Sequence, residues 1–142
     1  MTKLLLSLHV LAAIVAIGPV TVAASMFPRQ VAPDGGNAGL AAALHRVCSV
    51  YAVVGVSVPV FGLATAHEMG VLTDAWLIAS MILTALAAVV LGAGILPAQR
   101  AALAAPDAVR TPRLHMAAGV FNLLWAVVVV LMIVRPGSTT GA

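Results

Sequence analysis

Charged side chains are scarce in this chain, and this scarcity excludes most soluble functions. Charged residues make up 8% of the 142 residues and aromatic residues 4%, whereas hydrophobic residues make up 63%. Soluble domains carry about a quarter charged residues. The few aromatic side chains exclude a base-stacking surface, and the seven cations form no basic patch. The composition predicts a protein that contacts the lipid bilayer and binds no nucleic acid.

Cysteine is almost absent. The single Cys48 excludes an internal disulfide and a multi-cysteine zinc or iron-sulfur site. It falls within an apolar run, where a free cysteine packs as a small residue. The chain also has no phosphate-binding loop, nucleophile elbow or zinc-protease motif. The sequence identifies no catalytic residue and favours a protein that is not an enzyme.

Long apolar runs are what the sequence has in abundance. They cover residues 4–27, 44–66, 75–96 and 115–134. The first has 24 residues, about 36 Å of helix, which exceeds a hydrocarbon core of roughly 30 Å. The short connections leave no chain for a second domain. We therefore predict one all-α membrane domain over residues 1–142, a four-transmembrane-helix bundle with up-down-up-down topology.

Proline and glycine mark the breaks between and within these runs. A cluster of turn-forming residues at 33–37 separates the first two runs. Pro59 predicts a bend in the second run. Pro97 is expected to end the third helix, with a loop from Gln99 to Leu114 after it.

The first run also has the features of a signal peptide. Lys3 precedes it, Gly18-Pro19 interrupts it, and small residues up to Ala24 resemble a cleavage site. We expect instead that this run stays in the protein as the first membrane helix.

The cations predict how the chain is oriented. With four spans, Arg29, Arg46, Arg100, Arg110 and Arg113 share one side of the membrane, against Lys3 and Arg135 on the other. Positive residues gather on the cytoplasmic side. The two long loops are therefore expected in the cytoplasm and both termini outside.

Small residues recur every four positions in the third run, at Ser80, Thr84, Ala88 and Gly92. Such a ridge lets a second helix approach closely in lipid. It predicts a contact with a membrane-protein partner or with a second copy of this chain.

All four histidines lie at or near the ends of spans: His9 and His67 toward the outside, His45 and His115 toward the inside. Neutral imidazole can ligate haem iron, so a bis-histidine site at each face is one hypothesis, and interfacial anchoring is the other. His9 lies deeper and shares a helix face with Ala13 and Ala16. It is the best ligand candidate, although it could equally bond a neighbouring helix.

Four residues carry weaker signals. Asn122 shares a helix face with His115 and should point into the bundle, as an interhelical hydrogen bond or a ligand contact. Trp125 lies near the middle of its span, where it packs in the core, faces lipid or forms the wall of a pocket. His67 and Met69 form a His-x-Met pair that suits cuprous copper.

Four short motifs carry a family resemblance. They are His9 with the exit motif Phe27-Pro28-Arg29, then Leu44-His45-Arg46, Phe121-Asn122 and Arg135-Pro136. With them the chain resembles the copper-resistance protein D superfamily, which includes the bacterial membrane protoporphyrinogen IX oxidase, and within it a four-helix family of unknown function. The resemblance implies a b-type haem on His9 and a propionate contact for Arg29.

The oxidase pattern is incomplete in this chain. Pro97-Ala98-Gln99 stands where that family has a histidine, and Leu123 stands where an acidic residue follows the asparagine. Oxidase activity is therefore not expected. The resemblance implies a bacterial inner-membrane protein that binds haem b, with His9, Arg29, His45, His115 and Asn122 as cofactor-binding candidates. The alternatives are an accessory subunit of a membrane complex and, third, copper handling through His9, His67 and Met69.

Overall fold

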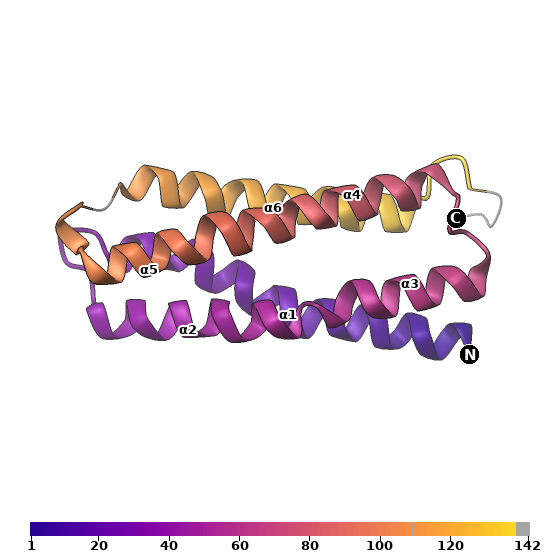
Figure 1. The fold of residues 1–142 in the computed structure, drawn as a ribbon, viewed down its shortest axis with the longest axis horizontal. Coiled ribbons are helices and arrows are strands. Elements are labelled where there is room, and N and C mark those ends of the chain that lie inside the picture. Colours follow the sequence, from indigo (N-terminus) through magenta and orange to yellow (C-terminus); the bar gives the residue numbers. More distant parts are fainter. Residues whose placement is uncertain (109, 139–142) are drawn as a thin grey trace.

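The computed structural model describes residues 1–108 and 110–138, and these form helices joined by short turns, with no β-strand among them (Figure 1). The elements are α1 (Thr2–Gln30), α2 (Ala38–Val54), α3 (Ser57–Met69), α4 (Ala75–Val89), the π-helical segment η1 (Val90–Ile95), α5 (Leu96–Ala104), the 3-10 turn η2 (Pro106–Ala108) and α6 (Thr111–Val134).

Four apolar helical stretches are long enough to cross a membrane. They are Thr2–Gln30, Ala38–Met69, Ala75–Ala104 and Thr111–Val134, because α2 continues into α3 and α4 continues through η1 into α5. Consecutive stretches run in opposite directions, and the start of α1 lies at the same end as the end of α6 (Figure 1). The predicted all-α, up-down-up-down bundle is confirmed. We call this end the terminal end and the opposite one the loop end.

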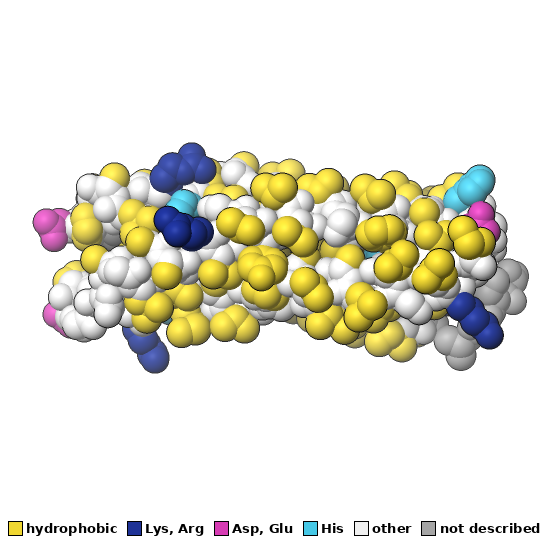
Figure 2. Space-filling model, turned by 90° about the horizontal axis from the view of Figure 1, so that it is seen from below, with side chains coloured by type: hydrophobic (Ala, Val, Ile, Leu, Met, Phe, Trp, Pro, Cys, Tyr) yellow, Lys and Arg dark blue, Asp and Glu magenta, His cyan; other side chains and the backbone are white. Residues whose placement is uncertain are grey.

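The outer surface is that of a multi-pass membrane protein. Large hydrophobic side chains are exposed along all four stretches. Figure 2 shows them covering the middle of one face, with the charged side chains toward the two ends. The helix directions place Lys3 and Arg135 at the terminal end and the other five cations toward the loop end. The distribution of charge thus fits a bilayer that surrounds the middle of the bundle.

The second stretch breaks where the bend was predicted. α2 ends at Val54 and α3 begins at Ser57, two residues before Pro59. Proline has no N–H to donate to the carbonyl four residues earlier. That carbonyl, on Gly55, accepts from the Val58 N–H at 3.1 Å instead. The break therefore leaves no unpaired backbone group at this carbonyl.

The prediction that Pro97 ends the third helix is wrong. Helix α5 runs through Pro97 to Ala104, and the loop that was expected from Gln99 begins only at Ala105. The π-helical segment η1 precedes the proline, and the Leu96 N–H donates to the Leu91 carbonyl, five residues back. Pro97 then occupies the start of α5, where a missing N–H costs nothing. A local widening of the helix thus accommodates the proline.

The buried core lies mostly in the loop-end half. Its centre consists of Val20, Phe27, Cys48, Ile95 and Phe121, which come from four different stretches. Every buried residue of α1 lies at Ala16 or beyond it. A second, smaller apolar cluster at the terminal end surrounds Trp76. The terminal half of α1 is therefore held by contacts other than a dense core.

The ridge of small residues is split between the inside and the outside of the bundle. Ser80 is fully buried within this chain, Thr84 is half-buried, and Ala88 and Gly92 are exposed. The predicted partner surface is therefore wrong in including Ser80. Only Ala88 and Gly92 are open to a helix from outside.

A clamp at the terminal end joins α4 to the end of α6. The indole N–H of Trp76 donates to Asp74 Oδ2 at 3.0 Å. The Arg135 guanidinium lies 5.4 Å from the centre of the Trp76 ring, a cation–π contact. Arg135 holds a left-handed backbone with φ of 48°, which strains any residue other than glycine. The cation–π contact therefore holds Arg135, just after the end of α6, in a strained backbone conformation.

Two substitutions at Arg135 separate these effects. We expect Arg135→Ala to lower the stability by about 0.5–1 kcal/mol through loss of the cation–π contact. Arg135→Gly loses the same contact but relieves the strain, and should be more stable than Arg135→Ala by about 1 kcal/mol. Thermal unfolding in detergent micelles measures the stability of both variants. Lys3→Ala, which removes the other cation of the terminal end, is the matched control. Equal unfolding midpoints for Arg135→Ala and the wild-type protein would contradict the clamp.

Candidate functional site

His9 is fixed by a hydrogen bond between helices. Its Nδ1 lies 2.9 Å from the backbone carbonyl oxygen of Val58 on α3, and the ring is half-buried. A carbonyl oxygen can only accept, so Nδ1 carries the proton and donates. In the neutral imidazole, Nε2 then carries the lone pair, and this is the form that ligates a metal or a haem iron.

The His9 ring lies directly against the backbone of α3 at Gly62. A Cβ atom on Gly62 would stand 2.9 Å from His9 Cε1 and 3.1 Å from Nδ1. Contacts this short displace the ring, so the absence of a side chain at position 62 is what admits the imidazole. Val58 and Gly62 lie one turn apart, and together they hold the ring from one face of α3.

Of the two interpretations given to His9, the bond to a neighbouring helix is confirmed. The same bond also meets a requirement of a ligand, because metal-ligating histidines usually donate their second ring N–H to a carbonyl or carboxylate. No group of three or more His, Cys, Asp or Glu residues that could hold a metal ion occurs in residues 1–108 and 110–138. His9 is therefore a single imidazole whose orientation is fixed by the Val58 carbonyl.

A second polar group lies in the loop-end half, between α2 and α5. His45 Nδ1 is 2.9 Å from Gln99 Oε1, and Gln99 Nε2 donates to Cys48 Sγ at 3.5 Å. Gln99 is 1% exposed and Cys48 is fully buried. The Gln99 oxygen can only accept, so His45 donates from Nδ1, and in the neutral imidazole the lone pair is then on Nε2. His9 and His45 share this arrangement in opposite halves of the bundle.

Gln99 was missed because Pro97 was expected to end the helix. The sequence nevertheless contained a signal, since proline is common in the first turn of a helix and the alanine-rich segment 98–105 favours helix. A polar residue in that helix would then have been expected to need a partner in the bundle.

The remaining predicted residues are dispersed. Arg29 is exposed in the last turn of α1, and His115 is exposed near the start of α6, both toward the loop end. His67 is exposed near the end of α3, while Met69 packs against the apolar cluster around Trp76. The bis-histidine pairs and the copper pair stay predictions.

Asn122 points into the bundle, as predicted. Its Nδ2 donates to Ser25 Oγ on α1 at 3.0 Å, and Ser25 Oγ donates to the Thr21 carbonyl at 2.7 Å. The Oδ1 atom of Asn122 is buried without a partner in the described part of the chain. The amide therefore joins α6 to α1.

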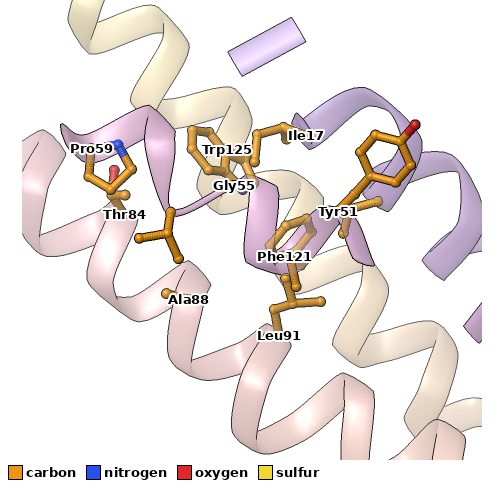
Figure 3. A pocket seen from close by; sticks show the side chains of 12 residues that line it. Ile17, Tyr51, Gly55, Pro59, Thr84, Ala88, Leu91, Phe121 and Trp125 are labelled. Carbon is orange, nitrogen blue, oxygen red and sulfur yellow. The ribbon is translucent and has the colours of Figure 1, made fainter. Parts of the chain in front are cut away.

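A cavity of about 140 Å³ lies beside the break between α2 and α3 (Figure 3). Its walls come from all four stretches: Ile17, Val20, Tyr51, Ala52, Gly55, Val56, Pro59, Thr84, Ala88, Leu91, Phe121 and Trp125. Trp125 is thus the wall of a pocket, one of the three roles expected for it. None of the four histidines lines this cavity.

Comparison of the chain with protein-family models, curated proteins and solved structures gives no match.

The bond between His45 and Gln99 makes a prediction about stability. We expect Gln99→Leu to destabilise the protein by about 1–3 kcal/mol, because it leaves the His45 N–H without its acceptor. The double variant His45→Leu with Gln99→Leu should recover most of this loss, since removing both partners of a bond is nearly neutral. Thermal unfolding in micelles compares the wild-type protein, the two single variants and the double variant, with Gln30→Leu as control. Additive losses in the double variant would contradict the bond.

Proposed function

We propose that this membrane protein binds b-type haem as part of a redox system in the bacterial inner membrane, with His9 as an axial ligand. The observation that supports this most is the hydrogen bond from His9 Nδ1 to the Val58 carbonyl. This bond orients the ring and leaves the lone pair of Nε2 available to coordinate iron. A bound haem would supply one-electron chemistry.

The surroundings of His9 fit a large apolar group better than a small hydrated ion. The terminal half of α1 has no buried residue, and its neighbours Leu8, Val10 and Leu11 are exposed. Carboxylates are absent from this half of α1, whereas a site for a hard cation needs several oxygen ligands. A single imidazole among apolar side chains therefore favours a metal held in an apolar macrocycle over a hydrated metal ion.

Arg29 cannot serve the same ligand as His9. Twenty residues separate them on the continuous helix α1, about 30 Å at 1.5 Å per residue. Arg29 lies instead at the end of the bundle where His45 holds its own free Nε2. We assign Arg29 and His45, with His115 at the same end of the bundle, to a second ligand at the loop end.

The haem proposal is tested by absorption spectroscopy of the protein purified from cells supplied with a haem precursor. We expect a Soret band that His9→Ala diminishes. Gly62→Leu should weaken haem binding by about 10–100-fold, because its side chain displaces the ring from Val58. Ser7→Ala, on an exposed side chain of the same half of α1, is the matched control and should keep the band.

A Soret band that His9→Ala leaves unchanged would exclude this site. Protein that stays without a Soret band after haem supplementation would exclude the class of function.

The orientation is a separate proposal, supported by the five cations toward the loop end against two at the terminal end. We expect alkaline phosphatase fused after Ala142 to be active, because this enzyme matures outside the cytoplasm, and green fluorescent protein fused there to be dark. Fusions that end at Asp107, in the second loop, should give the reverse pattern. Fluorescence from the C-terminal fusion would overturn the assignment.

An accessory role in a membrane complex is the second candidate. Ala88 and Gly92 are exposed, and a Cβ added to Gly92 would meet nothing within 4 Å. This open, small surface suits close approach by a helix of another protein. Colourless protein that purifies with a stoichiometric partner would decide in favour of this role.

A further inference from the structure

The loop end of the bundle has a hollow of about 380 Å³ between α5 and the start of α6. Figure 1 shows these two helices apart at this end. One wall consists of Ala98, Ala101, Ala102 and Ala105, which lie along α5 and at its C-terminal cap. Alanine side chains end at Cβ, so this wall, which we call the alanine wall, leaves the space between the helices open.

Two arginines at the start of α6 form the other wall. Arg110 and Arg113 both line the hollow, and both are exposed. Neither guanidinium has an ion pair or a hydrogen bond with another described residue. The two carboxylates of this end, Asp34 and Asp107, do not line the hollow. The hollow therefore carries two positive charges that no carboxylate in its walls balances.

The hollow extends from the headgroup level of a membrane toward the hydrocarbon. Arg110 and Arg113 lie at the start of the apolar stretch Thr111–Val134, where the polar layer of a bilayer meets its hydrocarbon core. Ala98 precedes Ala105 by seven residues, which places it about 10 Å deeper in the bundle. A phosphate ion would occupy only the charged end of this space, whereas an acyl chain can lie along the alanine wall.

We propose that this hollow binds one anionic phospholipid, with Arg110 and Arg113 on its phosphate and one acyl chain along the alanine wall. Guanidinium groups match phosphate oxygens in bidentate geometry, and basic pockets between membrane helices hold anionic headgroups. A zwitterionic lipid brings an ammonium group that the two arginines repel. The site shares no residue with the ligand sites proposed around His9 and His45 and is independent of them.

Native mass spectrometry of the full chain released from detergent micelles counts bound lipids directly. We expect phosphatidylglycerol to give a complex with one lipid, and phosphatidylcholine to bind about tenfold more weakly. The double variant Arg110→Gln with Arg113→Gln should weaken phosphatidylglycerol binding about tenfold and remove the preference.

The matched control for charge is the double variant Arg46→Gln with Arg100→Gln. It removes the same charge from two exposed arginines that do not line the hollow. Its affinity for phosphatidylglycerol should fall by about twofold at most, because these arginines attract the lipid only from a distance.

The alanine wall is tested separately. Ala101→Leu fills the hollow from α5 and should weaken phosphatidylglycerol binding about tenfold, because its side chain takes the space of the acyl chain. Ala104→Leu, on the same helix and outside the lining, is its control and should leave the affinity unchanged. Glycerol phosphate, which has the phosphate but no acyl chain, should not compete with the lipid at equal concentration. All the substituted positions are exposed, so the variants keep the fold.

Equal losses of affinity in the two double arginine variants would overturn the proposal, because they would reduce the site to a general attraction between cations and anionic lipid. Equal affinities of Ala101→Leu and Ala104→Leu would exclude the alanine wall. Competition by glycerol phosphate at equal concentration would replace the lipid by a free phosphate as the ligand.

Discussion

Hydrocarbon surrounds this protein, so nearly every backbone N–H and carbonyl must find its partner inside the bundle. The chain places Pro59 and Pro97 within its membrane stretches, and each removes one donor. Two different local solutions follow. At Pro59 the helix breaks and the Gly55 carbonyl accepts from Val58. At Pro97 the preceding turn widens into a π-helix and the helix continues. π-helical segments often occur at functional sites.

These two backbone solutions position the polar groups of the protein. The break exposes the side of the bundle at Gly55 and Val56 and so opens the cavity at mid-depth. The continuous α5 carries Gln99 into the bundle, where it meets His45 and Cys48. Together with the bonds from His9 to Val58 and from Asn122 to Ser25, this contact joins the stretches across their interfaces. Among the described residues, two buried side-chain atoms stand outside this pattern of paired groups, because Asn122 Oδ1 and Trp125 Nε1 have no hydrogen-bond partner.

Much of the architecture was predictable because it depends on composition and length alone. Four apolar runs with short connections allow few arrangements other than an antiparallel bundle, and the split of cations follows from the same topology. The sequence indicated which candidate residues are suited to a site by their chemistry, but not which partners they contact. His9 was identified as a ligand candidate because imidazole is rare in lipid, but its partner on α3 is a backbone carbonyl, which no side-chain pattern reveals. Gln99 was placed in a loop because the π-helical turn that rescues Pro97 has no simple signature in the sequence.

The four apolar runs are enough to establish an all-helical membrane protein with four spans, because a long uncharged segment has few other stable forms in a bilayer. Which polar atoms find a partner depends on how the helices pack against one another. His9 and His45 keep a free Nε2 because Val58 and Gln99 take up the other nitrogen. Trp125 borders a cavity because four stretches meet around a break in one of them. Such pairings join residues tens of positions apart, and helical periodicity within one span carries no information about the span that will face it.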